Sequence, residues 1–172
     1  MASKFIQHLS VEGVLVPQAQ PMPVCFGDRQ LADRPHALQL AAMLSGAERV
    51  RVVINSAWVL VPGIRGVLDM FPAALRLRVI GVTVPGNRLQ PHHCLVGSAR
   101  ESTWPTNDVN QRTPAQIAVL ESDTRNVPVP LPNRTTIISE GLWAASHDDW
   151  SGLRQIPACE DEVTRVAACR KL

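Results

Sequence analysis

The sequence predicts a single, mainly β domain folded as a jelly-roll-like β-sandwich or barrel with two or three short helices. Two segments, Arg49–Val61 and Leu75–Val84, are rich in β-branched residues and alternate apolar with polar side chains. The 14 prolines are dispersed, which cuts the chain into short pieces that suit strands and loops. A chain of 172 residues with 45% hydrophobic residues is long enough to bury one core.

The two strand-like segments differ in their alternation. In Arg49–Val61, every second residue from Val50 to Ile54 is apolar, so one row is expected to face the core. In Leu75–Val84 the apolar row changes phase between Val79 and Ile80, beside Gly81. Such a change predicts a β-bulge, or a strand that bends between two sheets.

Before these strands, residues 1 to about 30 are expected to form an N-terminal arm, in which Phe5–Val16 is an edge strand. Leu31–Leu44 is predicted to be a helix, because Asp33 can cap it, Pro35 suits its first turn and Ser45-Gly46 can end it.

Beyond the first strand, shorter elements are expected. The helices are Ile64–Phe71, Thr113–Leu120 and Glu160–Arg170, the last within a C-terminal tail of about 158–172, and the further strands are His93–Arg100 and Thr135–Ala144. A polar loop is expected before Thr113, whose place ahead of Pro114 suits an N-cap. No internal repeat or domain boundary is evident.

Composition and charge indicate where the protein acts and which classes of partner it is expected to bind. No apolar run reaches the roughly 18–20 residues that a membrane-spanning helix needs, and the first residues lack the pattern of a secretory signal. We therefore expect a cytoplasmic protein without membrane contact. The net charge of +2 predicts no strong attraction to polyanions.

Catalytic motifs are not evident. Ser146, His147 and Asp148 are contiguous, whereas a catalytic triad needs side chains that converge from separate backbone positions. The ten glycines form no phosphate-binding loop. The sequence therefore predicts a protein that is not an enzyme and needs no cofactor.

The most ligand-like cluster is His92-His93-Cys94. On a strand, His92 and Cys94 would share one side, and a metal site would need further ligands from distant parts of the chain. Exposed histidines beside a buried thiol are the alternative, and we expect no metal here.

Four arginines are candidates for RNA contact: Arg49, Arg51, Arg76 and Arg78. If their two strands paired on the same face, they would form a basic stripe able to neutralise phosphates. The alternative is that outward arginines keep the sheet from pairing at its edges.

About half of the chain resembles the single jelly-roll coat proteins of small icosahedral RNA viruses, the tymovirus type above all. The segments that carry the resemblance are Arg49–Val61, the connection to Phe71-Pro72, Leu75–Val84 with Pro85, His93–Arg100, Thr113–Ile117 and Thr135–Gly141. The 17 residues between Ile117 and Thr135 are fewer than the remaining strands of a jelly roll require, and the chain continues past the last strand.

The resemblance implies a structural subunit that assembles with copies of itself into a virion in the host cytoplasm, around an RNA genome contacted through its backbone. The alternative is a small intracellular β-barrel enzyme or ligand-binding protein, with a metal held by His92, His93 and Cys94. A third is a module that docks on a partner through Glu160–Leu172.

Overall fold

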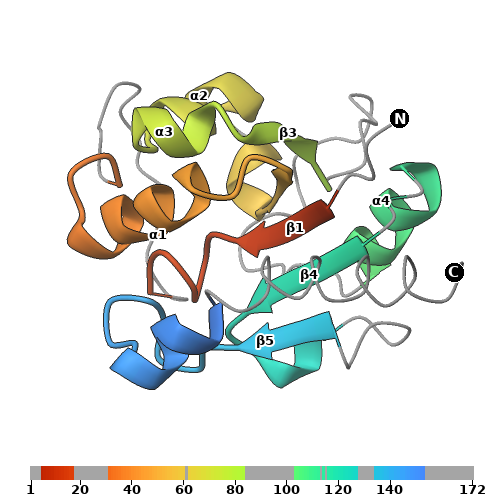
Figure 1. Cartoon of the computed structure of the whole chain (residues 1–172). Coiled ribbons are helices and arrows are strands. Elements are labelled where there is room, and N and C mark those ends of the chain that lie inside the picture. Colours follow the sequence, from red (N-terminus) through yellow and green to blue (C-terminus); the bar gives the residue numbers. More distant parts are fainter. Residues whose placement is uncertain are drawn as a thin grey trace, which may run out of the picture.

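The computed structural model describes residues 5–17, 31–60, 62–83, 103–112, 114, 116–127 and 134–153. These form a five-stranded sheet covered by helices (Figure 1). The strands are β1 (Phe5–Ser10), β2 (Val50–Asn55), β3 (Val79–Val82), β4 (Gln116–Glu121) and β5 (Thr135–Ile137). Their order is β3-β2-β1-β4-β5, and every neighbouring pair is parallel.

The predicted jelly roll is therefore wrong, because the chain is an α/β domain built on one parallel sheet. A jelly roll is antiparallel and can leave one face of each sheet in water. Here β1 is buried along its whole length and β2 along all but Arg51, as expected for strands covered on both faces. Parallel neighbours also need long crossover connections, which supply the helices.

The helical segments lie between these strands, except for the last one, which follows β5. They are α1 (Pro35–Ser45), η1 (Ala57–Leu60), α2 (Gly63–Asp69), α3 (Ala73–Arg76), α4 (Thr103–Arg112) and η3 (Thr124–Asn126), and residues 147–153 are also helical. Among the described helices, none is long and apolar enough to cross a membrane.

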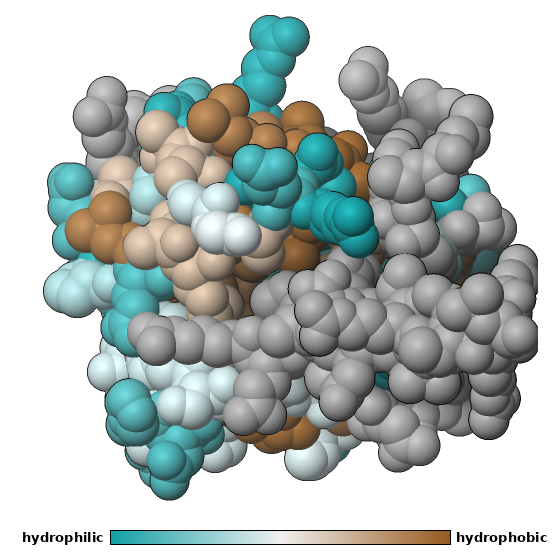
Figure 2. Space-filling view, viewed as in Figure 1, coloured by the Kyte–Doolittle hydropathy of each residue, from teal (hydrophilic) through white to brown (hydrophobic). Residues whose placement is uncertain are grey.

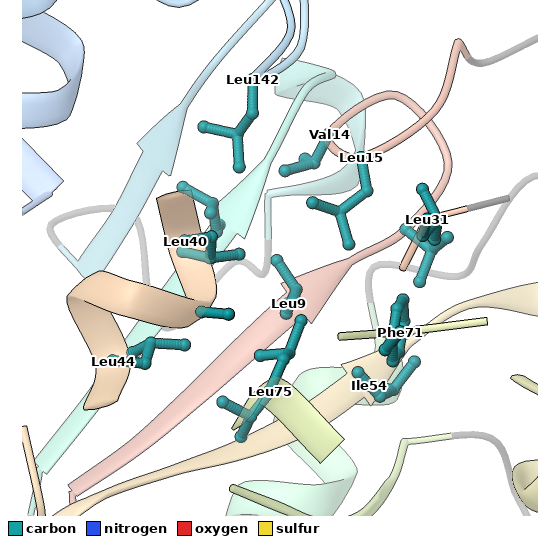
Figure 3. Close-up of a cluster of buried hydrophobic side chains, with 14 of the residues drawn as sticks. Leu9, Val14, Leu15, Leu31, Leu40, Leu44, Ile54, Phe71, Leu75 and Leu142 are labelled. Carbon is teal, nitrogen blue, oxygen red and sulfur yellow. The ribbon is translucent and has the colours of Figure 1, made fainter. Parts of the chain in front are cut away.

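One face of the sheet carries the main hydrophobic core. Leu9, Ile54 and Leu120 project from β1, β2 and β4 toward α1, α2 and α3. Leu40 and Leu44 of α1 and Leu75 of α3 close over them, as Figure 3 shows. This layer joins segments that are far apart in the sequence, so it specifies the order of the three central strands.

Several predictions are confirmed. The helix predicted over Leu31–Leu44 is present as α1, with Pro35 in its first turn and Gly46 after its end, but it begins at Pro35 instead of Leu31 and Asp33 does not cap it. Helix α2 lies within one residue of its predicted start. The pairing of β2 with β3 shifts between Val52 and Val53, which gives β3 one extra residue beside Gly81, as the change of phase predicted.

Other predictions are wrong for physical reasons. The segment read as an edge strand contains β1, which is the central strand. The residues read as the helix Thr113–Leu120 contain β4, and the polar segment before them contains α4. In Leu75–Val84 the first two residues belong to α3 and Leu77 is its C-cap; Leu75 is buried but Leu77 is 84% exposed. Helical spacing, not alternation, explains that difference.

Candidate polar site at the carboxyl ends of the strands

Four adjacent strands each place one polar side chain at the same level of the sheet. The parallel register pairs Ser10 of β1 with Asn55 of β2, and places Glu121 of β4 on the other side of Ser10. Thr83 follows β3 and donates its backbone N–H to the Ile54 carbonyl, which aligns it beside Asn55. We call Thr83, Asn55, Ser10 and Glu121 the polar row. It lies on the face opposite the main core, at the carboxyl ends of the strands.

Side-chain hydrogen bonds join the polar row from end to end. The Thr83 hydroxyl donates to Asn55 Oδ1 at 2.8 Å, and Asn55 Nδ2 donates to Ser10 Oγ at 3.2 Å. The Ser10 hydroxyl then donates to Glu121 Oε2 at 2.7 Å. All four side chains are buried. A buried polar chain of this kind costs free energy unless its members are hydrogen-bonded, and here each has a partner.

Glu121 also organises the residues that follow β4. Its Oε1 accepts hydrogen bonds from the backbone N–H of Ser122 at 2.8 Å and from that of Asp123 at 3.4 Å. The carboxylate therefore fixes the first turn after the strand as well as Ser10. Because Glu121 is fully buried, these donors compensate part of the cost of removing its charge from water.

A second buried carboxylate, Glu12, lies at the same edge of the sheet. It follows β1 in a tight loop that turns at Gly13, whose φ of 83° suits glycine. Glu12 Oε1 accepts a hydrogen bond at 2.9 Å from the backbone N–H of Ala57, at the start of η1. Ser56, just before η1, accepts from the Trp58 N–H at 3.1 Å. The hydrogen bond from Ala57 thus ties together the segments that follow β1 and β2.

The polar row crosses the point where the strand order reverses. The chain runs from β1 outward through β2 to β3, and then returns to the other side of β1 as β4. Ser10 and Glu121 occupy the two strands on either side of this switch. In open parallel sheets, ligands bind outside the carboxyl ends of the strands at such a point.

Next to the polar row lies a charged cluster that connects the sheet to α4. His8, two residues before Ser10 on the same face of β1, contacts Asp108 of α4 through Nε2 and Oδ2 at 3.0 Å. Arg112 Nε donates to the other oxygen of Asp108 at 2.6 Å. We call His8, Asp108 and Arg112 the α4 clamp. His8 Nδ1 is buried and has no hydrogen-bond partner in the described part of the chain.

The electrostatics of the clamp favour an ionised Asp108. Burial acts to raise the pKa of the Asp108 carboxyl, but hydrogen bonds from His8 and Arg112, and the charges of both, outweigh burial and hold the pKa below its usual value. Asp108 therefore stays a carboxylate at neutral pH and accepts from both partners.

The predicted arginine stripe is only partly assembled. Arg51 and Arg78 both donate to the Glu48 carbonyl, at 2.7 and 2.8 Å, near the amino end of β2. Arg76 lies on α3 and pairs with Asp69 at 3.3 Å, and Arg49 is exposed. These residues lie at the opposite end of the strands from the polar row. Whether they contact RNA stays a prediction.

The other predicted clusters give no site. His92, His93 and Cys94 lie outside the described residues. Ser146 Oγ accepts from the Asp149 backbone N–H at 3.2 Å and so caps the helical residues 147–153, and its hydroxyl donates to Asp149 Oδ2 at 2.8 Å instead of to His147. Within the described ranges, no three His, Cys, Asp or Glu side chains are grouped to hold a metal ion.

Sequence reasoning missed the polar row and the clamp because their members come from separate strands. Ser10 and Glu121 are 111 residues apart, and His8 and Asp108 are 100 apart. The available signal was a polar residue at the end of each apolar run: Ser10, Asn55, Thr83 and Glu121. That pattern is informative only once the strands are known to be parallel, since parallel strands bring their carboxyl ends to one edge.

Comparison of the chain with protein-family models, curated proteins and solved structures gives no match.

Proposed function

We propose that this protein binds Mg²⁺, together with a small phosphate-bearing ligand, at the carboxyl ends of β1, β2 and β4. The observation that carries the proposal is the 2.7 Å hydrogen bond between Ser10 and Glu121, which places a buried carboxylate directly at the switch point of the sheet.

The donor set favours a hard cation. Glu12, Glu121, Ser10 and Asn55 supply carboxylate, hydroxyl and amide oxygens at one edge. Mg²⁺ prefers such oxygens and is commonly held by only one or two carboxylates, with waters and a substrate phosphate completing its shell. In the proposed site the two glutamates would supply the charged ligands, and the phosphate would supply the ligands that the protein does not.

Binding can be measured by NMR titration of the ¹⁵N-labelled full chain with Mg²⁺, alone and with inorganic phosphate. We expect saturable shifts in the amides of the loops after β1, β2 and β4, and stronger Mg²⁺ binding when phosphate is present. Mn²⁺ in place of Mg²⁺ should broaden the same signals.

Matched glutamine variants test the assignment. Glu121→Gln and Glu12→Gln should each weaken Mg²⁺ binding by tenfold or more, on the order expected when one charged ligand is lost. Glu48→Gln and Glu140→Gln change exposed glutamates and should bind as the wild type does. Absence of saturable shifts in the folded wild-type protein, or equal loss in all four variants, would overturn the proposal.

Assembly into a shell stays a prediction, and its structural premise, the jelly roll, no longer supports it. One observation favours a simpler self-association. Ile64, Leu77 and Ile80 are exposed near β3, at one edge of the sheet, and Figure 2 shows apolar surface over α2 and β3. Light scattering of the wild type and of Leu77→Glu tests this: a dimer or larger species that becomes monomeric in the variant would support it, and a wild-type monomer would contradict it.

A further inference from the structure

We propose that Arg49, Arg51 and Arg78 bind the phosphate backbone of a nucleic acid at the amino ends of β2 and β3. Arg49 directly precedes β2, Arg51 is its second residue, and Arg78 directly precedes β3. We call these three residues the arginine corner. It lies at the opposite end of the strands from the polar row, so the proposal does not depend on the metal site.

Two of the guanidinium groups meet at one oxygen atom. Arg51 Nη1 donates to the Glu48 carbonyl at 2.7 Å, and Arg78 Nη1 donates to the same carbonyl at 2.8 Å. Because these two hydrogen bonds share one end, the two Nη1 atoms are no more than about 5.5 Å apart. Two positive charges at this separation repel each other, and a carbonyl dipole compensates them less than a full negative charge would.

The backbone contacts hold both side chains in place and leave donors unused. A guanidinium group has five N–H donors. Arg51 directs Nη1 to the carbonyls of Glu48 and Val50, and its edge formed by Nε and Nη2 has no partner in the described part of the chain. Arg78 donates through Nη1 and Nη2 to the carbonyls of Glu48 and Ser45. A phosphate group can therefore bind to guanidinium groups that are already fixed in position.

The arginine corner differs from other arginines in its lack of a carboxylate. Arg76, Arg112 and Arg125 each form an ion pair with an aspartate, at 3.3, 2.6 and 2.6 Å. Among the described residues, no carboxylate lies within ion-pair distance of the arginine corner. Arg76 was predicted to belong to the same basic stripe, but its pairing with Asp69 sets it apart.

The charge of the arginine corner fits an extended polyanion. Together with the exposed Glu48, the three arginines have a net charge of +2, which equals the net charge of the whole chain. A single small anion at an exposed site gains little, because water and salt screen its charge. A nucleic acid presents one phosphate after another and releases a counterion for each one that an arginine neutralises. Such contacts fix the position of the backbone without reading the bases.

Fluorescence anisotropy with the full chain and a labelled oligouridine of about 20 nucleotides tests the proposal, in EDTA so that the metal site is empty. We expect binding at low salt, with a slope of log K against log salt of about −2 for three neutralised phosphates. Oligothymidine of the same length should bind alike, because backbone contacts distinguish neither the bases nor the sugar.

Variants then test the residues. Arg49→Gln removes an exposed arginine and should weaken binding about threefold to tenfold while reducing the slope by about 0.7. Arg51→Gln should act in the same way, whereas Glu48→Gln should strengthen binding by removing a negative charge. Arg125→Gln removes the same charge at the other end of the strands and should bind as the wild type does.

Three outcomes would overturn the proposal. The first is a folded wild-type protein that does not bind either oligonucleotide at low salt. The second is a slope that stays unchanged in Arg49→Gln and Arg51→Gln. The third is an equal loss in Arg125→Gln, which would show that the overall charge of the chain, and not the arginine corner, attracts the nucleic acid.

Discussion

The two faces of the sheet differ most at the carboxyl ends of the strands. Toward α1 and α3 the strands present Leu9, Ile54 and Leu120, and the contacts are almost entirely apolar. Toward α4 the same strands present the buried apolar side chains of Ile6, Val53 and Val119, followed at the carboxyl ends by Ser10, Asn55 and Glu121. Burial of apolar area stabilises both faces, but the carboxyl end of the second face also needs every polar group to find a partner. That end of the sheet is therefore held by polar contacts as well as by apolar burial.

The largest loss in the free energy of unfolding is expected from a change in the main hydrophobic core. Leu9 is 1% exposed, so Leu9→Ala should lower the free energy of unfolding by about 3–4 kcal/mol, through lost burial and a cavity beneath α1. Urea denaturation followed by circular dichroism measures this. A loss below about 1 kcal/mol would mean that the core closes over the cavity more freely than its packing indicates.

The neighbouring residue tests the polar face. Ser10→Ala removes a hydroxyl that donates to Glu121 and accepts from Asn55. Leaving these two groups without that partner should cost about 1–2 kcal/mol in the same urea experiment. If Ser10→Ala were as damaging as Leu9→Ala, the polar row would be a structural core in its own right, and the contrast between the faces would fail.

On the side of the molecule that carries α1, the stability is expected to depend on pH through His36. His36 donates to the Leu15 carbonyl at 2.9 Å and meets Trp143 edge-on. Burial lowers the pKa of His36 below its usual 6.5; the hydrogen bond to Leu15 opposes this, and the charge of Arg34 adds to it.

The unfolded chain therefore takes up a proton at His36 before the folded chain does. The stabilisation is complete above pH 6.5 and is lost as the pH falls below that value toward the folded pKa. Unfolding free energies measured across this range should show a slope that His36→Asn removes and His147→Asn, at an exposed position, keeps. An unchanged slope in His36→Asn would assign the effect to other groups.

The smallest effect is expected at Gly81. A methyl group there would overlap the Arg112 guanidinium, which can swing aside because it ends a flexible side chain. Gly81→Ala should cost at most about 1 kcal/mol and leave the contact between His8 and Asp108 intact. A loss of more than about 2 kcal/mol in the free energy of unfolding would mean that Arg112 is the main support of the clamp.

The sequence predicts local features better than the assembly of the sheet. Pro35 and Gly46 mark the ends of α1, and the change of phase beside Gly81 marks the bulge, because each depends on neighbouring residues. Thr113-Pro114 resembles the start of a helix, so the sequence predicts a helix where the structure has β4. Pairing with β1, which lies far away in the sequence, decides the conformation of this segment.

The polar row and the contact between His8 and Asp108 were harder to predict for the same reason. β1 is buried on both faces, yet it contains the polar residues His8 and Ser10. These interrupt the apolar run expected of a central strand, and the resulting weak alternation resembles that of an edge strand. Their partner Asp108 lies in a segment predicted to be a loop, and Glu121 directly follows a segment predicted to be a helix. Only the parallel register relates these positions to one another.

The central position of β1 also imposes an order on folding. Once residue 82 has been synthesised, β1 can pair with β2, and α1 and α3 can pack on the apolar face of these strands. Its other edge has to wait for β4, which ends at Glu121. Until then the edge of β1 and the Ser10 hydroxyl have no strand beside them on that side, and contacts of such long sequence separation form slowly. A nascent chain that stops before β4 would therefore present an open edge to chaperones or to other chains.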